Sequence, residues 1–238
     1  MKLYMNISFF YEGGLFGVDS PLKFTTMGKI KQGILGGFSG TVGSVVGGSW
    51  KGINYMRGKA ASIKNPQTLQ QMQQRNKFAV AAFVLQPITA FIRVGFKRYA
   101  HKKTEFNAAM SYTIRNAIVG DYPDYMIDFE SLLVSRGSLT GANSGTATPV
   151  SGKIKLEWED NSGIGEAKPT DKALAVAINP AKGEAAYITE GAPRSAKTED
   201  LMVSPYWAGD DVEVYLAFIS EDGKDVASSS YLGTVTVI

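Results

Sequence analysis

Between residues 66 and 119, apolar side chains recur with the period of an α-helix. This spacing predicts three helices, over residues 66–86, 88–100 and 104–119. Asn65 and Pro66 make a favourable helix start, because Asn is a good N-cap and Pro suits the first helical position. Pro87 is expected to end or kink the first helix, since proline lacks the backbone N–H that continues it.

After residue 120 the period of the pattern changes to two, which is typical of strands. Short apolar runs separated by Gly, Pro, Asn, Asp and Ser predict strands over residues 131–136, 153–159, 172–179, 184–189, 212–219 and 229–238. Such a series favours an antiparallel β-sandwich. Trp158 and Tyr215 are its expected core anchors. The predicted fold class is therefore α+β in two parts, a glycine-rich segment with short helices followed by the sandwich.

Residues 28–58 hold ten of the 26 glycines, with large side chains between them. Glycine penalises regular helix and permits close approach of backbones. We interpret this segment as a packed extended chain or hairpin that contacts another chain, and a helical contact between small residues is the alternative. No dinucleotide or P-loop fingerprint follows the glycines. The candidate assembly residues are Gly36, Gly37, Gly40, Gly43 and Trp50.

The first 26 residues differ from the rest, and we expect them to be an extension or a docking arm. They meet the requirements of a signal peptide weakly, because no small-x-small cleavage site follows the apolar run. Secretion is therefore not expected, and we assign the chain to the cytoplasm or to a particle made there. The predicted domains are 1–26, 27–120 and 121–238.

The net charge of +3 conceals two halves of opposite sign. Residues 1–115 carry 16 Lys/Arg against 3 Asp/Glu, whereas residues 116–238 carry 9 against 19. The densest part of the basic half, residues 51–103, contains no acid. Its candidate contacts to a polyanion or a partner are Lys51, Arg57, Lys59, Lys64, Arg75, Lys77, Arg93, Lys97, Arg98, Lys102 and Lys103.

Three interpretations of this basic region stay open. A basic stripe with interleaved aromatics is the footprint of phosphate-backbone binding. The same charges would also pair with the acidic half of this chain or of a neighbouring subunit. The third interpretation is a solvated surface with no partner.

Composition argues against most enzyme chemistry. The chain has no cysteine, which excludes disulfides, thiolate zinc sites and cysteine nucleophiles. It has a single histidine, His101, which leaves little basis for a Ser/His/Asp triad. Two carboxylate clusters occur in turn-rich sequence, where Asp favours local hydrogen bonds. We therefore expect no catalytic residue, metal, cofactor or small-molecule substrate, and no membrane span, since no apolar run approaches ~18 residues.

Several segments of the chain, which occur in the same order as in the family, resemble an uncharacterised family of Bacteroidota proteins, domain of unknown function 6266. The segments are 28–43, 49–52, 64–68, 91–96, 106–111, 133–139 and 218–223. This resemblance covers residues 27–238 and implies no activity, because the family has none assigned. The C-terminal part also resembles a fibronectin type III or immunoglobulin-like sandwich, in its tryptophan strand 154–158 and tyrosine strand 212–218.

Together these observations predict a non-enzymatic structural or interaction protein. It would assemble through its glycine-rich basic half and display a β-sandwich, in a phage-derived or other multi-subunit particle. Self-association or a protein partner is expected. The alternative is a nucleic-acid-binding protein that uses residues 51–103 without sequence readout.

Overall fold

The computed structural model describes residues 29–30, 36–62 and 67–238 of the chain. The chain divides into two compact units, and the boundary falls between Lys64 and Asn65. The predicted extension 1–26, the helix start at Asn65-Pro66 and the candidate contact Lys64 lie outside the described residues.

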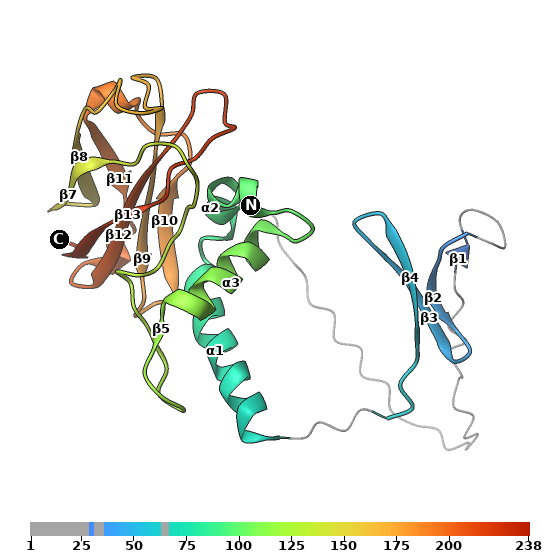
Figure 1. Cartoon of the computed structure of the whole chain (residues 1–238). Helices are drawn as coiled ribbons and strands as arrows, with labels where there is room; N and C mark the ends of the chain where they lie inside the picture. The colour runs from blue at the N-terminus through green and yellow to red at the C-terminus, as the bar shows by residue number, and fades with distance from the viewer. Residues whose placement is uncertain (1–28, 31–35, 63–66) are drawn as a thin grey trace, which may run out of the picture. The chain divides into compact units, whose positions relative to one another are not determined.

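The first unit contains an antiparallel sheet of four strands in sequential order, drawn in blue in Figure 1. The strands are β1 (Lys29–Ile30), β2 (Phe38–Val42), β3 (Val45–Trp50) and β4 (Ile53–Gly58). Two-residue turns join the last three strands. At Lys51-Gly52 both residues have left-handed backbone, with φ of 48° and 82°, as a type I′ turn requires. The hairpin prediction is thus confirmed for the described part of this segment, and the helical alternative is wrong.

Gly47 in β3 shows why glycine is needed here. A Cβ placed on it would lie 2.4 Å from the carbonyl oxygen of Phe38 and 2.6 Å from the Phe38 ring. The aromatic ring of β2 therefore covers the backbone of β3 at a distance that excludes every larger residue.

The second unit begins with the three predicted helices, α1 (Leu69–Leu85), α2 (Thr89–Gly95) and α3 (Glu105–Asn116). The hydroxyl oxygens of Thr68 and Thr104 accept hydrogen bonds from the backbone N–H of Gln71 and Asn107, which caps α1 and α3. The second helix is shorter than predicted, and a 3-10 turn, η1 (Lys97–Tyr99), follows it.

The third helix also ends earlier than predicted, because its last expected residues form a strand. This strand, β5 (Ile118–Val119), pairs with β6 (Met126–Ile127) in a hairpin. Gly120 takes the left-handed conformation, with φ of 84°, where the hairpin loop begins.

Seven further strands form two antiparallel sheets. The three-stranded sheet has the order β11-β8-β7, from β7 (Asn143–Val150), β8 (Lys153–Glu159) and β11 (Thr198–Met202). The four-stranded sheet has the order β10-β9-β12-β13, from β9 (Lys172–Asn179), β10 (Glu184–Ile188), β12 (Asp211–Ile219) and β13 (Ser230–Thr236). Side chains from both sheets share one buried core, in which the Trp158 and Phe218 rings meet edge to face at 5.4 Å.

The other face of the four-stranded sheet packs against the helices. Val176 of β9 and Ala217 of β12 belong to one buried cluster with Phe91 and Ile92 of α2. The helices lie beside β9 and β10 in Figure 1, on the side away from β7 and β8. The unit therefore has three layers, and its two central strands are buried on both faces.

This layering corrects the predicted domain boundary at residue 120. The change of period and of charge at that position is real in the sequence, but it falls inside the second compact unit. The helices and the sheet share a core, so 121–238 does not form a unit separate from the helices.

Five of the six predicted strands in residues 121–238 are confirmed, and the one over residues 131–136 is wrong. That segment is irregular: Leu132 and Val134 are buried in the core beneath the helices, and the N–H of Arg136 donates to the carbonyl of Gly95 at 2.9 Å. Its apolar pattern comes from burial against helices. Trp158 lies in the inter-sheet core, whereas Tyr215 faces the helices and donates to the carbonyl of Phe129 at 2.6 Å.

Candidate interaction surfaces

The candidate basic residues are distributed over both compact units. Lys51, Arg57 and Lys59 are exposed in the first unit. The others that the structure describes lie on the helices and their connections in the second unit: Arg75 and Lys77 on α1, Arg93 on α2, Lys97 and Arg98 on η1, and Lys102 and Lys103 before α3. The basic residues of segment 51–103 are thus divided between the two compact units.

Among these basic side chains, Arg98, Lys97 and Lys77 contact the acidic half of the same chain. Arg98 Nη1 lies 2.5 Å from Asp225 Oδ1 and 3.0 Å from Ser138 Oγ. Lys97 Nζ donates to the carbonyl of Gly223 at 3.2 Å. A third, Lys77, lies over the ring of Tyr125 at 4.8 Å. Pairing between the halves therefore occurs within the chain at the β12–β13 hairpin.

One face of the first unit carries a group of exposed apolar side chains. Directly paired residues of antiparallel strands point to the same face, and the pairs here are Trp50 with Ile53 and Gly48 with Tyr55. Trp50, Ile53 and Tyr55, hereafter the tip face, line one shallow apolar surface. Trp50 is 52% and Ile53 69% exposed. The candidate Trp50 is thus brought together with Ile53 and Tyr55, which were not among the candidate site residues.

The candidate glycines have distinct local roles. Gly43 occupies the β2–β3 turn with left-handed backbone, φ 57°, and Gly40 in β2 has φ 113°. A Cβ on Gly37 would lie 2.2 Å from the Asn54 side chain of β4. Gly36 precedes β2 and is half-buried.

The second unit has an apolar groove between α1 and the β5–β6 hairpin, with a volume of about 500 Å³. The large side chains that line this apolar groove are Val80, Phe83, Val84, Met126, Ile127 and Phe129. Phe83 is 51% and Met126 63% exposed, so both side chains are accessible to solvent.

The chain segment that forms one side of the apolar groove is acidic. The described residues 117–134 contain four acids and no base, and these four, hereafter the acidic rim, are Asp121, Asp124, Asp128 and Glu130. A hydrogen bond from Ser131 holds the pKa of Asp128 below its usual range, with help from the N–H of Glu130. This carboxylate therefore stays charged in neutral solution.

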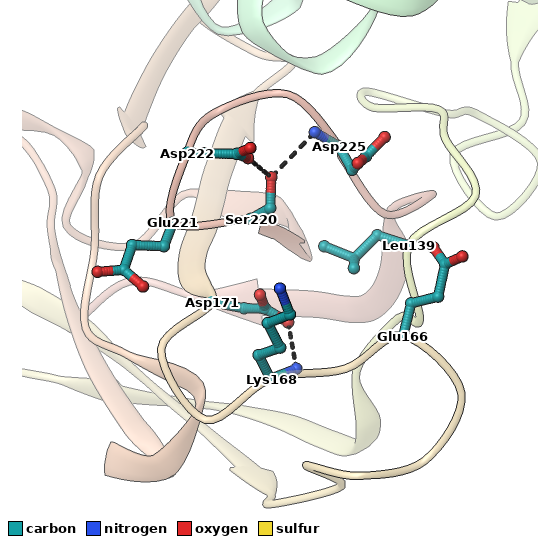
Figure 2. Close-up of a pocket in the computed structure, with 8 residues that line it drawn as sticks. All are labelled: Leu139, Glu166, Lys168, Asp171, Ser220, Glu221, Asp222 and Asp225. Atoms are coloured by element: carbon teal, nitrogen blue, oxygen red, sulfur yellow. Dashed lines mark hydrogen bonds between the residues drawn. The ribbon is translucent and has the colours of Figure 1, made fainter.

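A larger cavity, of about 660 Å³, opens at the end of the sandwich (Figure 2). Five of its lining residues are acidic: Glu166, Asp171, Glu221, Asp222 and Asp225. Ser220 Oγ donates to Asp222 at 2.7 Å and accepts from the N–H of Asp225 at 2.9 Å. Basic side chains neutralise three of the carboxylates, since Lys224, Arg98 and Arg194 pair with Asp222, Asp225 and Asp171 respectively. Three of the five carboxylates are thus paired within the protein, and Ser220 closes a hydrogen-bonded turn with Asp222 and Asp225.

Asp171 lies at the floor of this cavity and pairs with a buried arginine that the sequence interpretation missed. Arg194 donates to Asp171 Oδ2, to Asn161 Oδ1 at 2.6 Å, and to the carbonyls of Thr140 and Gly141. Its guanidinium lies over the Phe218 ring at 3.8 Å. Burial lowers the pKa of Arg194, and the charge of Asp171 opposes that effect. No sequence signal marks this arginine, because its partners come from three separate loops.

No group of three or more His, Asp or Glu is placed to hold a metal ion in the part of the chain that the structure describes. His101 is exposed in the turn before α3. Among the described residues no single helix is long and apolar enough to cross a membrane, and α1 with α2 reaches that length only across a bend of 89°.

The resemblance noted in the sequence agrees with a match to a family model. The model described as a family of unknown function, DUF6266, matches residues 37–233, which include β2 to β12 and most of β13. The chain belongs to this family. No curated protein matches the chain, and no solved structure matches it. The DUF6266 match spans both compact units, so the family model includes both the glycine-rich strands and the sandwich.

Proposed function

We propose that this DUF6266 protein is a non-enzymatic structural or interaction protein that assembles through its glycine-rich first unit and displays the sandwich of its second. The observation that carries the proposal is the tip face. β4 is exposed at all six positions, and Trp50, Ile53 and Tyr55 share one side of the sheet. A small meander with apolar side chains on a solvent face is a surface that gains free energy when a partner covers it.

The sandwich supports the display role by its architecture. A three-stranded sheet faces a four-stranded sheet, all pairings are antiparallel, and the chain crosses between the sheets after β8, β10 and β11. This order supports a fibronectin type III-like or immunoglobulin-like assignment, which is a common architecture of binding and spacing modules. The setting that we propose is a multi-subunit particle, of phage origin or otherwise.

Light scattering of the full chain over a range of concentrations tests self-assembly. We expect the mean mass to rise with concentration, and to rise less in a Trp50→Ser, Ile53→Ser double variant. A matched control is Met202→Ser with Tyr206→Ser, which removes two exposed apolar side chains of the second unit, 67% and 87% exposed. A monomer at every concentration in both wild type and control would remove self-assembly as the function.

Nucleic-acid binding is a second candidate, favoured by a specific feature of the tip face. Trp50 and Tyr55 are exposed, Arg57 lies next to Tyr55 on the same side of β4, and Lys59 follows β4. The first unit's described residues contain no acid. Exposed aromatics next to basic residues form the stacking and phosphate contacts of single-strand binders.

Fluorescence anisotropy with a labelled single-stranded oligonucleotide tests this second candidate. If it holds, affinity falls steeply as salt rises, because counterions are released on binding. An Arg57→Ser, Lys59→Ser variant would then bind more weakly, whereas Arg93→Ser in the other unit would not. An equal loss in both variants, or no binding at low salt, argues against it.

A further inference from the structure

The apolar groove of the second unit and the tip face of the first are complementary in three respects. The first is polarity. Large apolar side chains make both surfaces, and the most exposed members of each, Ile53 and Met126, are 69% and 63% exposed. Each surface would gain from leaving water.

The second respect is size. The groove has a volume of about 500 Å³. A cavity of about 150 Å³ in a protein core accommodates a benzene molecule. The groove therefore has room for about three side chains of ring size, and the tip face offers Trp50, Tyr55 and the smaller Ile53.

The third respect is charge. The tip face adjoins Lys51 in the β3–β4 turn and Arg57 next to Tyr55 on β4, in a described segment without acids. The segment 117–134, which supplies Met126, Ile127 and Phe129 to the groove, carries the four carboxylates of the acidic rim and no base. Bases also occur near the lining residues in sequence: Arg75 and Lys77 precede Ala79 on α1, and Lys77 lies over the Tyr125 ring. Lys182, which follows Pro180, pairs with Asp210. Opposite charges at the edges of two apolar surfaces steer association and fix its orientation.

We propose that the tip face of one copy docks into the apolar groove of a second copy. This inference rests on the proposed function, since assembly requires that the contact be made between chains. Tip and groove are different patches, so the interface is heterologous. Each docked pair therefore leaves one tip and one groove unoccupied. Such contacts grow into a closed ring or an open filament.

Two deficient variants of the full chain test the inference by complementation. The tip variant carries Trp50→Ser and Ile53→Ser, and the groove variant carries Phe83→Ser and Met126→Ser. In sedimentation velocity we expect each alone to self-associate at least tenfold more weakly than wild type. Mixed together, they should form a one-to-one complex that grows no further, because one supplies the only intact groove and the other the only intact tip.

The complex also shows that both variants are folded, and far-UV circular dichroism of each provides a second check. The Met202→Ser, Tyr206→Ser control should associate like wild type. Higher salt should weaken the complex, because the acidic rim and the basic tip attract each other.

Other outcomes overturn the inference and separate it from the proposed function. If the tip variant loses association and the groove variant keeps it, the tip docks elsewhere and assembly still stands. If the mixture yields no complex while wild type associates, tip and groove do not meet between chains. If wild type is monomeric throughout, both the docking and the assembly fail. Loss of nucleic-acid binding in the tip variant, with association unchanged, assigns the tip to nucleic acid.

Discussion

Arg194 and Asp171 form an ion pair in which both side chains are fully buried, with 3.2 Å between Nη2 and Oδ2. The carboxylate oxygen Oδ2 also accepts from the N–H of Lys168 at 2.8 Å. The pair joins the start of β9 to the turn before β11 and to the loop before β7, through the Thr140 and Gly141 carbonyls. It therefore holds one end of the sandwich together.

Removing the carboxylate should destabilise the protein strongly. Asp171→Ala leaves the buried guanidinium without its counter-charge, and breaking such a pair costs about 3–5 kcal/mol. Urea unfolding of the second unit measures the loss. The control is Glu190→Ala, which breaks the exposed pair with Lys172 and should change stability by about 1 kcal/mol or less. Equal, small effects of the two variants would contradict a structural role for the buried pair.

Asp210 gives the stability a dependence on acid pH. Hydrogen bonds from Lys182 and Asn179 hold the pKa of Asp210 below its usual range. A group whose pKa is lower in the folded state stabilises the fold above its unfolded pKa, about 3.9, and loses that contribution as pH falls through the folded value. Asp210→Asn should therefore be less stable than wild type at pH 6, and the difference should shrink below pH ~4.

Urea midpoints from pH 2 to pH 6 measure this difference. Asp211→Asn is a suitable neighbour for comparison, because Asp211 is exposed and accepts a hydrogen bond from Thr236 at the edge of the sheet. A difference between Asp210→Asn and wild type that stays constant over the whole range would show that the carboxylate does not act through its charge.

The sequence pattern predicted the helices and most strands because their periodicity reflects burial. It failed at strands that break the expected pattern. β7 and β11 lie at sheet edges and are rich in polar residues, so no alternation marked them. The runs in β9 and β12 are nearly continuous in apolar residues, which is the signature of burial on both faces. Read that way, they predict a further layer against the four-stranded sheet, and the helices supply it.

The candidate surfaces were predictable only in part. The sequence indicates Trp50 as a candidate because it is an aromatic residue among glycines. The register of β3 with β4 then places Ile53 and Tyr55 on the same face as Trp50. Phe83 and Met126 are 43 positions apart and meet only because α1 packs beside the β5–β6 hairpin. No local pattern predicts such a groove, since it depends on tertiary packing.

Gly47 supplies a prediction about the first unit. Alanine at this position would place its Cβ 2.4 Å from the Phe38 carbonyl oxygen, and backbone has little freedom to yield. Overpacking of this kind costs about 1–3 kcal/mol. Amide hydrogen exchange should therefore become about tenfold faster across β2 and β3, because 1.4 kcal/mol corresponds to a factor of ten. The Lys59 N–H, which donates to Ser44 at 2.7 Å, is a convenient reporter.

The matched control for Gly47→Ala is Gly58→Ala, because a Cβ at Gly58 meets nothing within 4 Å. Its exchange rates should equal those of wild type. Slow exchange in both variants would show that the Phe38 ring and backbone accommodate a methyl group, and that the close packing of β2 on β3 does not require glycine.

Truncation tests where the second unit begins. Both buried clusters lie within residues 81–237, so a chain of residues 67–238 should unfold cooperatively, with the urea midpoint that the second unit has in the full chain. A chain of residues 121–238 should not unfold cooperatively, although the sign of the charge and the period of the apolar pattern change near its start. Without the helices, one face of β9 and β12 would expose Leu174, Val176, Ile178, Tyr215, Ala217 and Ile219 to water.

Apolar surface of that extent drives aggregation or a loosely packed state. The shorter chain should therefore bind a hydrophobic dye, lose its near-ultraviolet circular dichroism and elute as aggregates, whereas 67–238 should elute as a folded species. A cooperative, monomeric 121–238 would show that the two sheets suffice as a core. The helices would then be a covering that the sandwich does not need, and the boundary that the charge pattern suggests would be a structural one.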